Sequence, residues 1–331
     1  MHELVLARLQ TKPTPVLAQL PLDGGSLLAA FAPQPRGSML WLAKTAYGAS
    51  ACLRLQAEAN ALTLLAPVAA TLQLPQLLAF SAAGEGQSAS ACLLQTALPG
   101  RPLRCRWRAS LSLPKATAAV LRWLQLFQDC TANLPLPRPS LADLGAAVAR
   151  DTRLALQRQP QLQPLLAWVL DCFAAPGPAC PAVAIHGDFW FGNVMWNSRP
   201  PSLGVIDWSS FGVGSALDDL LTWMTHLPAG RSGRYRAHVE VWPAVLLASG
   251  SPRQMLCDWA RRASYDAATA RYAFYLFLAR RLLWELGFGL QQRDADERAR
   301  AQRDWSAVLA WLTAHGFPDP VSSQPQALRA A

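Results

Sequence analysis

One loop near the middle of the chain restricts the fold more than any other feature. It runs from His186 to Asn193, follows the apolar segment 183–185 and contains Asp188; a second apolar segment ends at Asp207. A single Gly-Asp or Gly-Asn pair is typical of an ordinary turn, because these residues adopt turn conformations easily. The complete set, with each acid or amide near the end of a predicted strand, favours one shared site over separate turns.

The oxygen atoms of this set fit the transfer of a phosphoryl group. The Asp188 carboxylate would orient an acceptor hydroxyl and take its proton, which requires positioning more than a high pKa. The amide oxygen of Asn193 and the carboxylate of Asp207 are ligands that Mg²⁺ prefers, and they would hold the ion against nucleotide phosphates. The sequence therefore predicts Asp188 as the catalytic base and Asn193 and Asp207 as metal ligands.

Before this loop, strand and turn signals predict a small antiparallel sheet. Residues 16–47 contain three short apolar runs, separated by a Gly-Gly turn at 23–26 and by a turn with Pro and Gly at 33–37. Two further strands are expected at 76–81 and 91–98. Residues 50–66 between them show helical periodicity. The predicted buried face of this helix consists of Leu53, Ala57, Ala61 and Leu64 or Leu65.

After residue 98 the chain is mainly helical. Helices are expected at 115–133, 140–158, 161–174 and, with interruptions, from 216 to about 314. We therefore expect an α+β fold with a small antiparallel-sheet N-terminal lobe at 1–97 and a large, mainly helical C-terminal lobe at 98–331.

The loop at 186–193 resembles that of the aminoglycoside phosphotransferase/choline kinase superfamily, and its Trp190 and Gly192 are similar to residues of fructosamine kinases. The segment 207–212 is more similar to aminoglycoside phosphotransferases. The resemblance implies a two-lobed, protein-kinase-like fold, ATP and Mg²⁺ as cofactors, and a small-molecule hydroxyl as the acceptor of the phosphate. The N-terminal lobe would bind the nucleotide, and the C-terminal lobe would carry the catalytic loop and the acceptor.

The resemblance extends upstream to Lys44 and Glu58. The segment 40–44 resembles the strand that carries the family's phosphate-contacting lysine, and Glu58 follows fourteen residues later, at the family's spacing. The resemblance implies that Lys44 contacts the α- and β-phosphates and that Glu58 holds it in place. Taken alone, the two residues are equally typical of a strand-end lysine and a solvated helix residue.

Two further similarities concern the nucleotide. Gly24, Gly25 and Ser26 occupy the place of a phosphate-covering turn, where backbone N–H groups would bind phosphate oxygens. Ala97 and Leu98 end a segment that resembles the hinge whose backbone recognises adenine. The family often has an acidic residue one position earlier, where this sequence has threonine.

The family's segment after the magnesium aspartate is similar to residues 214–220. By that match Asp219 would support the catalytic loop around His186, with Asp218 as its competitor. A helix cap, or a solvated acid at the start of a helix, is an equally good interpretation of the two acids.

The composition allows a large core and gives no sign of a membrane protein. The 331 residues are 52% apolar and 15% charged. No uninterrupted apolar run reaches the roughly eighteen residues that a transmembrane helix needs. The N-terminus lacks the pattern of a signal peptide, and the seven cysteines include no CxxC pair. We therefore expect a cytoplasmic, reduced protein with no membrane partner and no zinc site.

The formal net charge of +9 comes mainly from arginine. The run Arg101, Arg104, Arg106 and Arg108 is too short to indicate a nucleic-acid-binding stripe, so no nucleic-acid partner is expected. Residues 209–331 contain fourteen arginines and eleven acids, which argues against a polycationic acceptor. We expect a small hydroxyl compound as acceptor, in the range of a sugar, a ketosamine or an amino alcohol. Within this range the charge favours a neutral or partly anionic compound, such as a sugar or a glycated amine. Four tryptophans could stack on a sugar ring, although core packing is their commoner role: Trp223, Trp242, Trp259 and Trp284.

Three other interpretations stay open. The chain could be a pseudokinase or scaffold that binds a nucleotide without transferring phosphate, an aminoglycoside-resistance kinase, or a basic nucleic-acid-binding protein. A pseudokinase usually lacks at least one of five residue types that are all present here. The five are Lys44, Glu58, Asp188, Asn193 and Asp207.

Overall fold

The computed structural model describes residues 16–22, 26–31, 41–103, 113–198, 201–226, 242, 251–286 and 295–315. Contacts divide the chain into two compact units, and each is described by itself. The first unit combines Met1–Pro135 with Asp188–Gly212, and the second combines Leu136–Gly187 with Val213–Ala331. The expected lobe boundary near residue 98 stays a prediction.

The first unit contains a five-stranded antiparallel sheet with the strand order β1-β2-β3-β5-β4. Its strands are β1 (Val16–Leu22), β2 (Ser26–Phe31), β3 (Trp41–Tyr47), β4 (Leu77–Ala83) and β5 (Ser90–Thr96). All five predicted strands are confirmed. The third was expected at 38–44 and ends three residues later, because its pairing with β5 continues as far as Tyr47 opposite Ser90. Residues 38–40 of the expected span lie outside the described residues.

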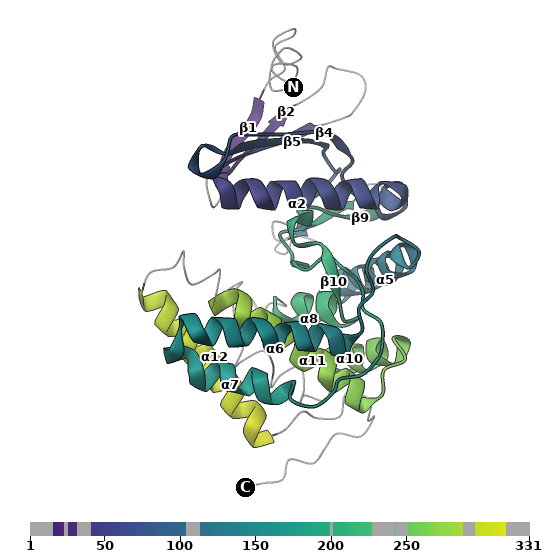
Figure 1. The fold of residues 1–331 in the computed structure, drawn as a ribbon. Coiled ribbons are helices and arrows are strands. Elements are labelled where there is room, and N and C mark those ends of the chain that lie inside the picture. The colour runs from purple at the N-terminus through teal and green to yellow at the C-terminus, as the bar shows by residue number, and fades with distance from the viewer. Residues whose placement is uncertain are drawn as a thin grey trace. The chain divides into compact units, whose positions relative to one another are not determined.

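Helix α2 (Ala49–Leu65) lies across one face of this sheet (Figure 1). Its buried side includes Leu55, Glu58 and Leu62, whereas Leu53 is 70% exposed. The helix is confirmed, but the predicted face was wrong at Leu53 and at Ala57, which is also exposed. The reason is that the buried face contains an acid, and apolar periodicity alone counts an acid as solvent-facing.

A three-stranded sheet in the same unit has the order β6-β8-β9. It joins the segment after β5 to the hairpin that follows the catalytic loop. Gly100 makes this junction possible: its φ is +110°, and an added Cβ would lie only 2.6 Å from the carbonyl carbon of Trp196. The remaining elements of this unit are η1 (Ala66–Val68), α3 (Ala69–Leu72), η2 (Gly86–Ser88), β6 (Arg101–Pro102), α5 (Leu113–Thr131), β8 (Val194–Ser198), β9 (Pro201–Val205) and η4 (Trp208–Ser210).

The second unit is mainly helical, as the sequence predicts. Ser140 and Asp143 form a reciprocal capping box at the start of its first helix. The short strands β7 (Val183–Ile185) and β10 (Gly212–Gly214) pair with each other, and they carry the chain into the catalytic loop and toward the two buried acids. The helices are α6 (Leu141–Arg158), η3 (Pro160–Leu162), α7 (Gln163–Cys172), α8 (Asp218–Thr225), α10 (Ser251–Arg262), α11 (Ala267–Trp284) and α12 (Ala295–His315).

The α+β class, with a small antiparallel sheet toward the N-terminus and a mostly helical remainder, is therefore confirmed. None of the helices in the described ranges is long and apolar enough to cross a membrane. Within the same ranges every cysteine is free, and no three His, Cys, Asp or Glu side chains gather as a metal site.

Candidate active site

Lys44 and Glu58 form an ion pair between strand β3 and helix α2. Lys44 Nζ donates to both carboxylate oxygens of Glu58 at 2.7 Å. The side chains of Lys44 and Glu58 are only 14% and 2% exposed. The alternative of two unrelated, solvated residues is therefore wrong. Burial by itself lowers the pKa of Lys44, but the carboxylates of Glu58 and Asp207 outweigh it and raise that pKa, so Lys44 stays cationic.

The loop after β9 closes around this pair. Asp207 Oδ1 lies 3.8 Å from Lys44 Nζ and accepts a hydrogen bond from the Ser209 hydroxyl at 3.0 Å. Glu58 also accepts a hydrogen bond from the backbone N–H of Trp208. Lys44 is thus flanked by two carboxylates that come from different elements. Asp207 itself has a φ of +65°, a conformation that is uncommon for a residue with a side chain.

The loop that carries Asp188 is held by Asn193. The side-chain Nδ2 of Asn193 donates to Oδ2 of Asp188 at 3.0 Å and to its carbonyl oxygen at 2.9 Å. The backbone oxygen of Asn193 accepts from the N–H of Ile206 at 2.9 Å, directly before Asp207. The three predicted catalytic and metal-binding residues therefore belong to one hydrogen-bonded pair of loops within the first unit.

A cluster of buried aromatic side chains holds the loops that contain Asp188 and Asp207. Phe189 follows Asp188, Trp208 follows Asp207, and both aromatic side chains are fully buried. The ring of Phe189 stacks on that of Trp123 in α5, with 5.4 Å between the ring centroids. The ring centroid of Trp208 lies 5.6 Å from that of Phe127 in the same helix. Such pairs contribute about 0.5–1.5 kcal/mol each beyond the burial of their area. The residue after each acid is thus an anchor in a common cluster.

Sequence reasoning missed Trp123 and Phe127 as supports of the site. The available signal was their spacing of four residues on an apolar helix, together with an aromatic residue directly after each acid. That signal predicts buried aromatic side chains, but it does not say that the helix and the two loops share one cluster.

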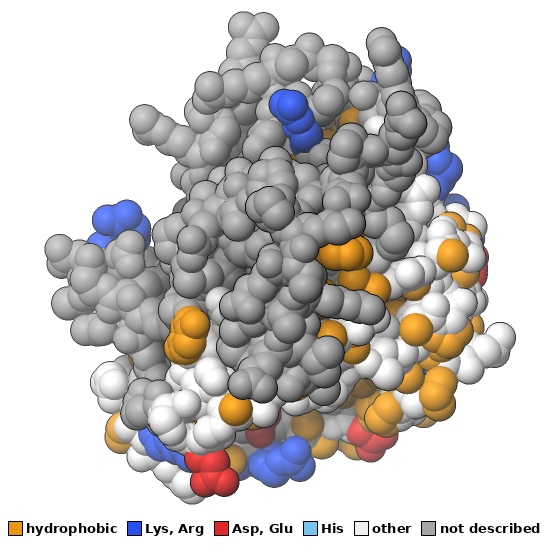
Figure 2. Space-filling view, turned by 90° about the horizontal axis from the view of Figure 1, so that it is seen from above, with side chains coloured by type: hydrophobic (Ala, Val, Ile, Leu, Met, Phe, Trp, Pro, Cys, Tyr) orange, Lys and Arg blue, Asp and Glu red, His pale blue; other side chains and the backbone are white. Residues whose placement is uncertain are grey.

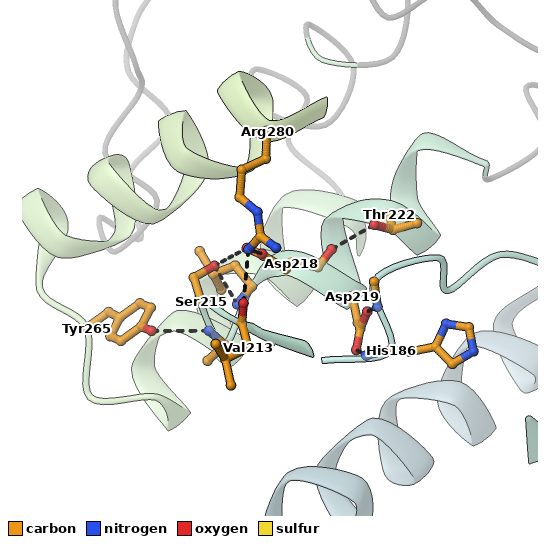
Figure 3. Close-up of polar contacts among 11 residues, drawn as sticks. His186, Val213, Ser215, Asp218, Asp219, Thr222, Tyr265 and Arg280 are labelled. Carbon is orange, nitrogen blue, oxygen red and sulfur yellow. Dashed lines mark hydrogen bonds and ion pairs between the residues drawn. The ribbon is translucent and has the colours of Figure 1, made fainter. Parts of the chain in front are cut away.

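In the second unit, Asp219 holds the backbone that leads into the catalytic loop (Figure 3). Its two carboxylate oxygens accept hydrogen bonds from the N–H groups of His186 at 2.7 Å and Gly187 at 2.9 Å. Asp218 instead contacts Ser215 and Arg280. Both acids are 4% exposed, so the alternative of a solvated helix start is wrong. Of the two, Asp219 is the one that contacts the loop.

Burial is the main reason that the pKa of Asp219 is raised to about 6. The Coulombic interaction with His186 and the hydrogen bonds from the two backbone N–H groups act in the opposite direction, and the neighbouring Asp218 adds to the rise. The carboxylate that supports the loop therefore has a pKa of about 6.

The predicted nucleotide contacts are only partly within the described residues. Gly24 and Gly25 lie outside them, and Ser26 begins β2 opposite Leu22. Ala97 and Leu98 line a shallow groove together with residues of α3 and of the β8–β9 hairpin. Thr96 stands in the place of the family's acid. Its hydroxyl oxygen accepts a hydrogen bond from the backbone N–H of Gln76 at 2.8 Å, and this bond joins the end of β5 to the residue before β4.

Trp190 lies over Gly192 inside the catalytic loop. A Cβ added to Gly192 would come within 2.6 Å of the Trp190 ring, so the glycine leaves room for the indole. Trp190 is half-buried, and its backbone N–H donates to the carbonyl oxygen of Asp188 at 3.1 Å. The two residues that resemble fructosamine kinases therefore contact each other next to the predicted base.

Most of the tryptophans considered as stacking surfaces belong to the core. Trp223, Trp242 and Trp259 are buried, whereas Trp284 is 50% exposed, with the guanidinium of Arg281 4.8 Å from its ring centre. Positive side chains show no stripe on the face seen in Figure 2, where the described Lys and Arg side chains lie apart from one another.

Comparisons with solved structures identify proteins of similar fold. One is a macrolide 2'-phosphotransferase from Brachybacterium faecium, with 15% identity and a TM-score of 0.54; the match covers 92% of this chain and 98% of that chain. Another is an ethanolamine kinase from Plasmodium vivax, with 12% identity and a TM-score of 0.54; the match covers 90% of this chain and 83% of that chain. At these identities they show the fold alone, and the predicted kinase-like fold class is confirmed. No curated protein matches the sequence.

The family itself is shown by a sequence model. The model of the phosphotransferase enzyme family (APH) matches residues 41–252, more than half of the 331 residues, and this range includes Lys44, Glu58, Asp188, Asn193 and Asp207. The chain therefore belongs to the phosphotransferase enzyme family.

Proposed function

We propose that the protein is an ATP-dependent kinase that transfers the γ-phosphate of Mg-ATP to a hydroxyl group of a small molecule. The observation that carries the proposal is the joint placement of Lys44, Glu58, Asp188, Asn193 and Asp207 within one compact unit. A buried ammonium beside two carboxylates and a base held by an amide are the parts that phosphoryl transfer requires.

Lys44 and the hinge segment would bind the nucleotide. The charged Lys44 would contact the α- and β-phosphates, while the Glu58 carboxylate keeps its ammonium in place. Gly24, Gly25 and Ser26 would cover the phosphates through backbone N–H groups. Ala97 and Leu98 follow the last described β3–β5 pair, Trp41 with Thr96. Within the described residues no β-ladder bond occupies their backbone groups, which would bind the adenine ring.

The residues present fit a Mg²⁺ ion. Asn193 uses its Nδ2 to bind Asp188, which directs its oxygen away from that contact, and Asp207 is 43% exposed. One carboxylate and one amide oxygen suit Mg²⁺, which usually takes its other ligands from nucleotide phosphates and water. When bound, the ion would neutralise charge on the phosphates.

Asp188 would act on the acceptor. Its carboxylate is fixed by Asn193 and is part-exposed, so it can reach a hydroxyl and accept its proton during transfer. The half-buried Trp190 two residues later offers an aromatic surface beside the base. The acceptor would be a sugar, a ketosamine or an amino alcohol. The excess of arginine over acid in residues 209–331 and this aromatic surface favour a neutral or partly anionic compound among them, such as a sugar or a glycated amine.

The test is a transfer experiment with γ-labelled ATP. The wild-type protein and the Asp188→Asn variant are each incubated with Mg-ATP and a pooled metabolite extract, and labelled products are identified by mass. We expect at least one metabolite to be labelled by the wild type and not by the variant. Nucleotide binding without any transfer would instead identify a pseudokinase and contradict the proposal. Transfer to aminoglycosides alone would contradict the proposed class of acceptor.

A further inference from the structure

Helix α8 begins with two adjacent buried acids, Asp218 and Asp219, that point in different directions (Figure 3). Successive helix residues differ by about 100° around the axis, so Asp218 and Asp219 face different partners. Asp219 binds the backbone of His186 and Gly187, which leads into Asp188. Asp218 has no part in the site as derived so far, although burying a carboxylate is costly.

Arg280 of α11 explains why a second acid is buried here. Its Nη1 donates to Oδ2 of Asp218 at 2.9 Å and to the carbonyl oxygen of Val213 at 3.2 Å. One guanidinium therefore joins the middle residue of strand β10 to the first residue of helix α8. Ser215, between them in sequence, donates from its hydroxyl to the other carboxylate oxygen of Asp218.

Gly214 allows this close approach. An added Cβ would come within 2.9 Å of Nη1 of Arg280 and 2.7 Å of Cδ1 of Ile185, and closer still to Oδ2 of Asp218. Ile185 ends β7 and directly precedes His186. The guanidinium, the carboxylate and the strand that leads into the catalytic loop thus meet at Gly214, where the absence of a side chain leaves room for them.

The middle of the same turn is held by α10 and by the segment that joins it to α11. The N–H of Ala216 donates to the hydroxyl oxygen of Tyr265 at 3.2 Å, and Nε1 of Trp259 donates to the carbonyl oxygen of Ala216 at 2.7 Å. Both backbone groups of Ala216 are therefore satisfied by side chains that lie more than forty residues away in sequence. The conformation of the turn depends on the helices after residue 250.

We propose that Arg280 and Asp218 are positioning residues for the catalytic loop: they fix the turn at 213–218, so that Asp219 meets the N–H groups of His186 and Gly187 next to Asp188. Arg280 touches no predicted reacting group and acts through Asp218 and the start of α8. The kinetic part of this inference rests on the proposed kinase function, whereas its structural part does not.

The structural part is tested by amide hydrogen exchange in the full-length protein. Arg280→Met removes the guanidinium but keeps most of the side-chain volume. We expect exchange at His186 and Gly187 to accelerate by about tenfold, because Asp219 no longer holds them. The matched control is Arg261→Met on α10, which removes an arginine that pairs with Asp258 while both side chains are more than half exposed. Unchanged exchange at His186 and Gly187 in Arg280→Met would overturn the proposal.

The kinetic part is tested by hydrolysis of Mg-ATP, with water as the acceptor, well below the melting temperature. A displaced base lowers turnover more than nucleotide affinity, so we expect Arg280→Met to reduce kcat by about 10- to 100-fold and to leave the KM for ATP nearly unchanged. Arg280→Lys should restore kcat in part, because an ammonium keeps the charge but cannot reach both oxygen atoms in the same geometry. A kcat equal to that of the wild type in Arg280→Met would contradict the positioning role.

A double variant separates positioning from stability. In Arg280→Met the unpaired Asp218 destabilises the fold, and adding Asp218→Asn removes that buried charge. We expect the double variant to recover most of its melting temperature but not its kcat. If kcat returns together with stability, the pair is merely structural. If the wild type neither hydrolyses Mg-ATP nor labels any metabolite, the proposed kinase function fails, while hydrogen exchange still decides whether Arg280 positions the loop.

Discussion

Lys44 Nζ donates to both carboxylate oxygens of Glu58 at 2.7 Å, and the carboxylate of Glu58 also accepts from the N–H of Trp208. The ion pair therefore joins three elements: strand β3, helix α2 and the loop that contains Asp207. An interaction of this kind affects nucleotide binding and the arrangement of the second loop together, so its loss should be visible in both activity and stability.

Replacing Lys44 with methionine should destabilise the protein and abolish activity. It leaves the Glu58 carboxylate buried at 2% exposure without its cation, a change that typically costs about 3–5 kcal/mol. Denaturant unfolding measures this loss, and steady-state kinetics should show a large fall in kcat/KM for ATP. The control is Lys115→Met, at an exposed lysine on α5, which should change neither quantity.

The double variant Lys44→Met with Glu58→Met tests the cause of that instability. Removing both charges relieves the desolvation of Glu58, so the double variant should be more stable than Lys44→Met alone and equally inactive. If it is no more stable than the single variant, the buried charge is not what destabilises the fold.

Asp188→Asn should separate catalysis from folding. The asparagine oxygen can still accept the hydrogen bond from Nδ2 of Asn193, so the free energy of unfolding should stay within about 0.5 kcal/mol of the wild type. Loss of the base should lower kcat by roughly 10²–10⁴-fold. Asp151→Asn, at an exposed acid on α6, is the control. Retention of more than half of the wild-type kcat in Asp188→Asn would assign the base elsewhere.

The local parts of this structure could be predicted from the sequence, because each depends on residues close together in the chain. The five strands are bounded by turn residues such as those at 23–26, and the loop from Asp188 to Asn193 lies directly after a short apolar strand. Strand and turn preferences of this kind act over a few residues. The pairing of Lys44 with Glu58 could be predicted from their spacing only because the spacing resembles that of a known family.

The long-range parts could not be predicted in the same way. Helix α2 buries Glu58 and exposes Leu53, because the ion pair of Glu58 with Lys44 of strand β3 decides which side of the helix faces the sheet. The partner of Asp218 is Arg280, sixty-two residues away. Nothing in the neighbourhood of either acid indicates that one of them binds the loop and the other binds a helix, since both have the same local sequence context.

Gly100→Ala should be among the most damaging glycine substitutions in the first unit. The residue has a φ of +110°, and a Cβ would collide with the backbone of Trp196 and Asn197, which cannot move without breaking the β6–β8 pairing. We expect a loss of about 3 kcal/mol or more in the free energy of unfolding. Gly86→Ala is the matched control: its φ is +57°, but nothing lies within 4 Å, so the cost should be about 1–2 kcal/mol. Equal losses for the two variants would show that the collision with the backbone of Trp196 and Asn197 adds nothing to the cost of the positive φ.

Asp219 should give activity and stability opposite dependences on pH. Burial raises the pKa of Asp219 from 3.8 to about 6, so the folded protein binds a proton more readily than the unfolded chain. The free energy of unfolding should therefore rise as pH falls from above 6 to below 3.8. Because one pKa unit corresponds to about 1.4 kcal/mol, the full change from this group is roughly 3 kcal/mol.

Activity should fall in the same range, because a protonated carboxyl can accept only one of the two hydrogen bonds from His186 and Gly187. We expect kcat to decrease as pH drops below about 6, measured in wild type and in Asp219→Asn. The amide of the variant places an N–H₂ group against one backbone donor, so its kcat should be low and should not titrate between pH 5 and 7. An acid limb near pH 6 that persists unchanged in Asp219→Asn would show that another group controls it.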